Sequence, residues 1–83
     1  STQKIEKAAT EMSERIGKSI EQIGVGGGRG SVAGLQKQYK NLLFSMEEAG
    51  VGGLKAFDQT LKSAGQLRDK VDDLQNLIKI NEQ

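Results

Sequence analysis

The chain has 83 residues, 12 basic and 11 acidic side chains with a formal charge of +1, and neither cysteine nor histidine. This composition excludes disulfides and the strongest zinc ligands, and it removes the commonest general base and the thiol nucleophile of enzymes. A charge near zero provides no basic face for nucleic acid, and no apolar run approaches the roughly 20 residues of a membrane span. We therefore expect a protein that is not an enzyme, carries no metal or cofactor, and binds no nucleic acid.

The length indicates one small domain, residues 1–83. A chain of this size buries only about 60% of the surface that it exposes when unfolded, so its stability in isolation is marginal. Small folds usually gain further stability from disulfides, metals or a partner subunit, and this composition leaves the partner subunit. We expect the chain to associate with copies of itself.

Apolar residues recur every three or four positions in three segments, which is the period of an α-helix. The predicted helices cover about residues 3–23, 31–49 and 54–81. The third is the longest, and its apolar spacing averages close to the 3.5 residues of a coiled-coil seam. The predicted fold class is therefore all-α, with three helical segments of which the C-terminal one is long.

Two glycine-rich joints separate the predicted helices. Residues 19–27 recur 26 positions later as residues 45–53, with six of nine residues identical, and each copy ends in Gly-Val-Gly-Gly. Glycine loses more backbone freedom in a helix than any other residue, so we expect joints at 24–30 and 50–53, the first being the looser. The expected hinge residues are the glycines of the two tetrads: Gly24, Gly26, Gly27, Gly50, Gly52 and Gly53.

The second joint decides the architecture. If it is a turn, the second and third helices form an antiparallel hairpin; if it is a kink, residues 31–80 form one helix roughly 75 Å long at 1.5 Å per residue. Three glycines in four residues cost roughly 3 kcal/mol within a continuous helix, at about 1 kcal/mol each, which favours the turn. In that turn we expect Gly50 to be left-handed and Val51 to be the apolar residue that follows the helix end.

Two groups of residues suggest binding chemistry, and each has a simpler interpretation. Residues 24–30 contain five glycines but lack the lysine and the preceding strand of a phosphate-binding loop, so we interpret them as a linker. Asp69, Asp72 and Asp73 share a helix face, as metal ligands would. Because Arg68 can pair with Asp72 and the group lies opposite the apolar stripe, we interpret it as a solvated charged face.

The third predicted helix has more apolar residues near its end than one short neighbouring helix covers. We expect an assembly interface there, formed by Leu67, Val71, Leu74, Leu77, Ile78 and Ile80. Burying one such side chain stabilises by roughly 1.5–3 kcal/mol, so leaving several of them in water is costly. Phe44 lies outside the main apolar stripe of the second helix and suggests a second partner surface.

In its overall plan the chain resembles the subunits of type III secretion needles and of the related Hrp pili of plant-pathogenic bacteria. The shared features are the length, the helical content, the absence of cysteine, the few aromatic residues and the apolar C-terminal helix. The run Gly24-Val25-Gly26-Gly27 is similar to the glycine-valine joints of Hrp pilins. The resemblance implies a helical tube that unfolded effectors traverse, with polar residues of the third helix facing the lumen, such as Lys62, Gln66, Asp69 and Asp73.

These observations lead to two hypotheses. The first is a structural subunit that self-assembles through apolar helix faces into a filament or tube such as a secretion needle or pilus, with other secretion components as further partners. The second is a small helical adaptor or chaperone that binds a partner helix. The sequence shows no charged segment followed by an apolar one, as a cleaved signal peptide would. The first hypothesis therefore predicts a secreted or surface protein exported without such a signal, and the second predicts a cytoplasmic one.

Overall fold

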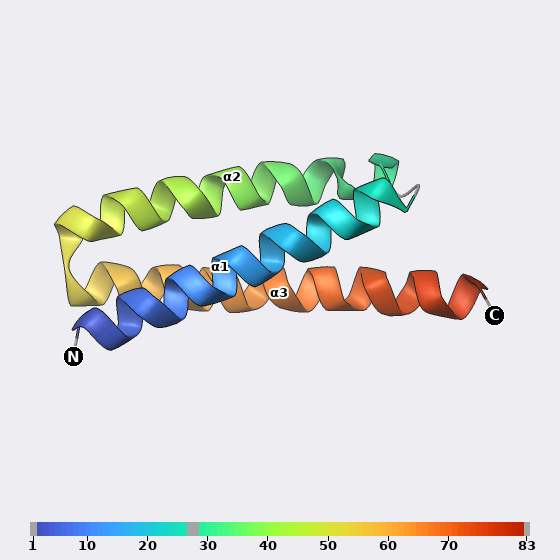
Figure 1. Cartoon of the computed structure of the whole chain (residues 1–83). Helices are drawn as coiled ribbons and strands as arrows, with labels where there is room; N and C mark the ends of the chain where they lie inside the picture. Colours follow the sequence, from blue (N-terminus) through green and yellow to red (C-terminus); the bar gives the residue numbers. More distant parts are fainter. Residues whose placement is uncertain (1, 27–28, 83) are drawn as a thin grey trace.

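The computed structural model describes residues 2–26 and 29–82, and all of them except Gly26 and Gly53 are helical. Helix α1 runs Thr2–Val25, α2 runs Arg29–Gly52 and α3 runs Leu54–Glu82. The helices pass up, down and up again, so α1 and α3 run in the same direction and α2 runs against both (Figure 1). Each helix contacts the other two, and the bundle is 44 Å long. The predicted all-α fold class is confirmed.

The core lies along the line where the three helices meet. It consists of buried side chains from every helix: Ile16, Ile20, Ile23, Val32, Leu35, Leu42, Ala64, Leu67 and Val71. A smaller cluster around Ala9, Ala49 and Phe57 lies towards the α2–α3 turn. Apart from Ala49, these residues belong to the stripes that the helical spacing predicts, whereas Leu43 and Leu54 of the same stripes are exposed.

Gly17 brings α1 close to α2. A Cβ atom at this position would lie 2.5 Å from the hydroxyl oxygen of Tyr39 and 2.8 Å from the ring carbon that carries it. A glycine within a helix costs roughly 1 kcal/mol relative to alanine. At this position the Tyr39 ring occupies the space that the Cβ atom of an alanine would fill.

The joint between α2 and α3 is the single residue Gly53, whose φ of +83° lies in the left-handed region. Its N–H donates to the carbonyl oxygen of Ala49 at 3.1 Å, and its own carbonyl oxygen accepts from the N–H of Phe57 at 3.1 Å. One glycine therefore ends α2 and begins α3. The two helices form the antiparallel hairpin of the turn hypothesis, and residues 31–80 are not one continuous helix (Figure 1).

The second joint is shorter than the sequence predicts. Gly50 and Gly52 lie inside α2, and the left-handed residue is Gly53 instead of Gly50. Val51 is also helical and is 92% exposed, so it does not pack as the apolar residue that follows a helix end. Each glycine destabilises a helix by only about 1 kcal/mol. Backbone hydrogen bonding and the burial of Ala49 therefore suffice to extend α2 through Gly50 to Gly52.

The first joint is shorter as well. Gly24 lies within α1, and Arg29 and Gly30 already belong to α2. Gly26 follows the end of α1 and still donates its N–H to the carbonyl oxygen of Gln22 at 3.0 Å. Gly27, the remaining predicted hinge residue, lies outside the described residues.

Candidate functional site

The six candidate interface residues of α3 do not form one surface. Leu67 and Val71 are buried in the core of the chain itself. Leu74 and Ile78 pack partly buried against that core, whereas Leu77 and Ile80 are 57% and 64% exposed. The expectation that all six await a second copy is wrong for Leu67 and Val71, because α1 and α2 together cover this part of α3.

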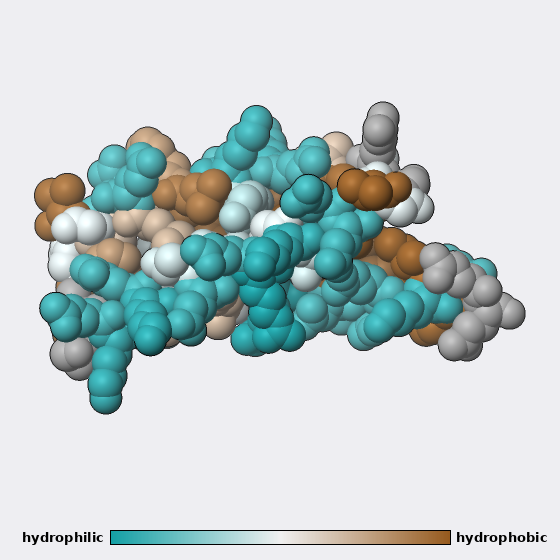
Figure 2. Space-filling model, viewed as in Figure 1, coloured by the Kyte–Doolittle hydropathy of each residue, from teal (hydrophilic) through white to brown (hydrophobic). Residues whose placement is uncertain are grey.

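Other large apolar side chains are exposed at the two ends of the bundle. At the α2–α3 turn are Val51 and Leu54, which we call the hairpin-end patch. At the other end are Val25, Leu77 and Ile80, which we call the opposite-end patch. Figure 2, viewed from the side on which α1 lies, shows brown surface towards both ends and a teal middle. Exposed apolar groups of this kind mark sites of interaction.

Phe44 is exposed away from both patches, in the middle of α2. The ring is 62% exposed, and its neighbour Leu43 is exposed too. Phe44 borders a hollow that Glu48 and Gln59 also line, one from α2 and the other from α3. The exposure of this ring agrees with its place outside the main apolar stripe of α2, and the second partner surface stays a prediction.

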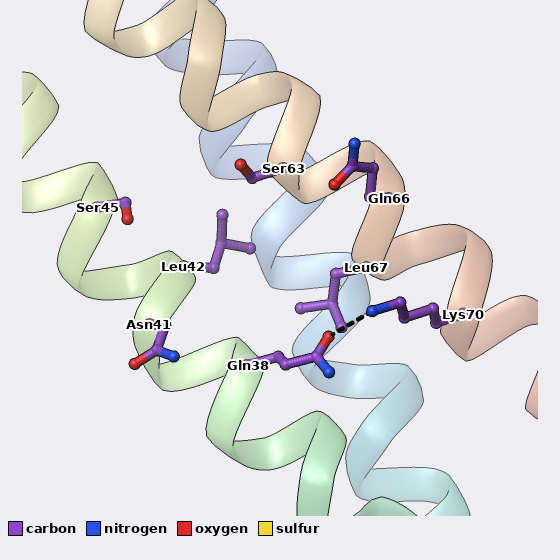
Figure 3. A pocket seen from close by; sticks show the side chains of 8 residues that line it. All are labelled: Gln38, Asn41, Leu42, Ser45, Ser63, Gln66, Leu67 and Lys70. Carbon is purple, nitrogen blue, oxygen red and sulfur yellow. Dashed lines mark hydrogen bonds between the residues drawn. The ribbon is translucent and has the colours of Figure 1, made fainter.

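A groove runs between α2 and α3 on the side turned away from α1 (Figure 3). Its volume is about 220 Å³, and its lining consists of Gln38, Asn41, Leu42, Ser45, Ser63, Gln66, Leu67 and Lys70. Leu42 and Leu67 point towards each other between the helices, and the Nζ atom of Lys70 donates to Oε1 of Gln38 at 3.3 Å across the groove. This lining offers amide and hydroxyl groups that can hydrogen-bond a polar surface.

We call the exposed side of α2 and α3 around this groove the open face. On α2 it consists of Lys37, Asn41, Phe44 and Glu48, and on α3 of Lys55, Gln59, Gln66, Lys70 and Asp73, all of them exposed. The spacing of four, three and four residues on α2 places its members on one side of the helix. The open face therefore has one aromatic residue near its middle and charged residues towards both ends.

Among the side chains that the structure describes, no ion pair includes a charged residue of the open face. The ion pairs there join Lys7 with Glu11, Lys62 with Asp58, and Arg68 with Asp69. Each of these pairs lies within a single helix. The charges of the open face are therefore not paired with one another or with another described side chain.

The acidic cluster of α3 does not form the predicted contact. Arg68 pairs with Asp69 at 3.2 Å instead of with Asp72. Asp69 and Asp73 are exposed and Asp72 is half-exposed, and the described part of the chain contains no group of three side chains placed to hold a metal ion.

No family model matches the chain, and no match was found among curated proteins or solved structures. In the part of the chain that the structure describes, no helix combines the length and the apolarity needed to cross a membrane. The features that bear on function are therefore the two apolar patches and the open face.

Proposed function

We propose that this chain is a non-catalytic structural subunit that binds copies of itself through apolar helix surfaces and builds a helical filament or tube. The observation that carries this proposal is the exposure of apolar side chains at both ends of the bundle, in the hairpin-end patch and the opposite-end patch. A subunit with two separate contact surfaces can make two different contacts, and such contacts extend an assembly when they do not close into a ring.

Energetics favour many contacts over one. Full burial of a valine, leucine or isoleucine side chain stabilises by roughly 1.5–3 kcal/mol. Association costs an estimated 4–15 kcal/mol in translational and rotational freedom, so a patch of two or three such residues gives weak binding alone. Assembly therefore requires each subunit to make several contacts at once, as it does in a filament.

The remaining properties of the chain support the same proposal. A formal charge of +1 puts little electrostatic repulsion in the way of many chains associating. Because the chain resembles needle and pilus subunits in its length and its arrangement of helices, a secretion needle or pilus is the kind of filament to test first. Export to the cell surface or to the medium belongs to this proposal.

The test is light scattering and negative-stain electron microscopy of the concentrated protein, with one variant for each patch. We expect filaments from the wild type and none from Val51→Asp/Leu54→Asp or from Leu77→Asp/Ile80→Asp, since each variant places charge where apolar contact is needed. The matched control is Ala8→Asp/Thr10→Asp, which adds the same charge at exposed positions of α1 and should leave the filaments intact.

The contrary result is equally clear. A wild type that remains monomeric at high micromolar concentration rules out self-assembly. The chain would then be better explained as a small helical adaptor, and the search would turn to a partner helix that binds it.

A further inference from the structure

We propose that the open face binds the open face of a second copy of this chain, with the two copies antiparallel and related by a two-fold axis that passes close to Phe44. In this pairing α2 lies along α2 of the second copy, and α3 lies along α3. The inference rests on the proposed function, because it specifies one of the contacts from which the assembly is built.

The order of charges along each helix carries the inference. On α2 the negative Glu48 lies near the hairpin end and the positive Lys37 lies about three turns away on the same side. On α3 the order is reversed, with the positive Lys55 near the hairpin end and the negative Asp73 five turns away. Lys70, one turn before Asp73, already donates to Gln38 of its own chain. An antiparallel second copy places its Lys37 opposite Glu48. It also places its Asp73 opposite Lys55, and two-fold symmetry repeats both ion pairs.

Both helices require the same position for the axis. The midpoint between Lys37 and Glu48 falls between residues 42 and 43 of α2, and the midpoint between Lys55 and Asp73 falls at residue 64 of α3. These positions lie at nearly the same height in the hairpin, since Leu42, Ser63 and Leu67 line one groove (Figure 3). One axis therefore satisfies the charges of α2 and of α3 together.

The exposed ring of Phe44 fits the same axis. Phe44 lies next to it, so the rings of the two copies approach each other at the centre of the contact, where aromatic residues contribute most to binding. Leu77 lies 13 residues beyond residue 64, and the matching position before residue 64 falls outside α3, which begins at Leu54. The two end patches therefore stay available for other contacts.

A two-fold axis parallel to the helices explains less. It pairs α2 with α3 of the second copy and would satisfy the charges as well, with Glu48 against Lys55 and Lys37 against Asp73. It also places Phe44 against the polar part of α3 around Gln59 and Ser63, which lie at the same height, so the two rings do not meet. The aromatic contact thus favours the antiparallel pairing. The uncharged side chains of Asn41 and Gln66 lie near its middle, in keeping with the depletion of charge at the centre of interfaces.

Single-cysteine variants test the pairing, because the chain has no cysteine of its own. Asn41 is exposed on the open face close to the axis, so mild oxidation of Asn41→Cys should link most of the protein into disulfide dimers. The matched control is Ala8→Cys on the exposed side of α1, which should remain unlinked at the same concentration.

Four outcomes overturn the inference or separate it from the proposed function. Equal linkage of Asn41→Cys and Ala8→Cys rejects the open face as an interface. Linkage only when Asn41→Cys is mixed with Gln66→Cys shows the parallel arrangement and rejects the antiparallel one. If the wild type forms filaments but Asn41→Cys does not form disulfide dimers, the proposed function is supported and this pairing is rejected. If Asn41→Cys forms disulfide dimers but the wild type forms no larger particles, this pairing is supported and the filament is rejected.

Discussion

The outer side of α1 and the open face of α2 and α3 are both polar, yet their charges are arranged differently. On α1 the signs alternate over single turns, and Lys7 lies 4.0 Å from Glu11. On the α2 part of the open face the two signs are separated by three turns, and no ion pair among the described side chains includes Glu48 or Lys37. Alternating charges are neutralised within their own helix. Charges separated along a face are left available to pair with charges of a second copy, which is why we assign the contact to the open face.

The two sides also differ in packing. Gly17 brings α1 so close to α2 that a Cβ atom would overlap the Tyr39 hydroxyl. On the opposite side, α2 and α3 leave a groove of about 220 Å³ between Leu42 and Leu67. One side of the hairpin is thus sealed by a helix of the same chain, and the other is left for a further molecule.

The largest expected effect concerns the sealed side. Ile16 is almost fully buried between the helices, so Ile16→Ala should lower the free energy of unfolding by about 2–5 kcal/mol. Urea denaturation followed by circular dichroism measures this change. Ser63→Ala, in the groove of the open side, should change it by no more than about 0.5 kcal/mol. If both variants lost the same free energy of unfolding, the side of the hairpin that α1 covers and the open face would not differ in their contribution to the fold.

The next effect tests how the hairpin is held. Gly53 is left-handed, so Gly53→Ala should destabilise the fold by about 1–2 kcal/mol. Gly50 is helical with open space around its Cα, so Gly50→Ala should stabilise it by about 0.5–1 kcal/mol. Thermal unfolding of both variants gives the signs. A loss of stability in Gly50→Ala together with no change in Gly53→Ala would contradict the observed turn.

A charge-reversal cycle compares the two faces directly. Glu48→Lys turns both symmetry-related ion pairs with Lys37 into repulsions, and self-association should weaken about tenfold. Lys37→Glu should do the same, and combining the two substitutions should restore binding. Sedimentation equilibrium measures the association constants. The matched cycle of Glu11→Lys and Lys7→Glu on α1 should leave association unchanged. If the double variant associates no more strongly than either single variant, Glu48 and Lys37 do not form an ion pair between copies.

The smallest expected effect is on α1 itself. Lys7 and Glu11 form an exposed pair within one helix, so Glu11→Gln should change the free energy of unfolding by less than about 0.5 kcal/mol. Chemical denaturation of the wild type and of Glu11→Gln measures this difference. A larger loss would show that the charged side of α1 contributes to the fold.

The sequence predicts the helices well because their apolar stripes are long and regular. It places the turn within one Gly-Val-Gly-Gly copy but assigns the left-handed conformation to Gly50. Glycine propensity alone cannot show that hydrogen bonding and packing around Ala49 extend α2 to Gly52.

The candidate site was harder to predict. Leu67 and Val71 are apolar on the same stripe as Leu77, and only the position of α1 shows that the first two are already covered. The spacing of Lys37, Phe44 and Glu48 is visible in the sequence, but the side of the hairpin that α1 occupies is not. The exposed status of Phe44 was predictable because it lies outside the apolar stripe of its helix.

The most direct test of the account is the mass of the wild-type chain in solution over a concentration series, measured by light scattering. The account predicts a mass that rises above the 9.0 kDa of one chain, through a dimer to larger particles, as concentration increases. A single species of 9.0 kDa at every concentration would contradict it.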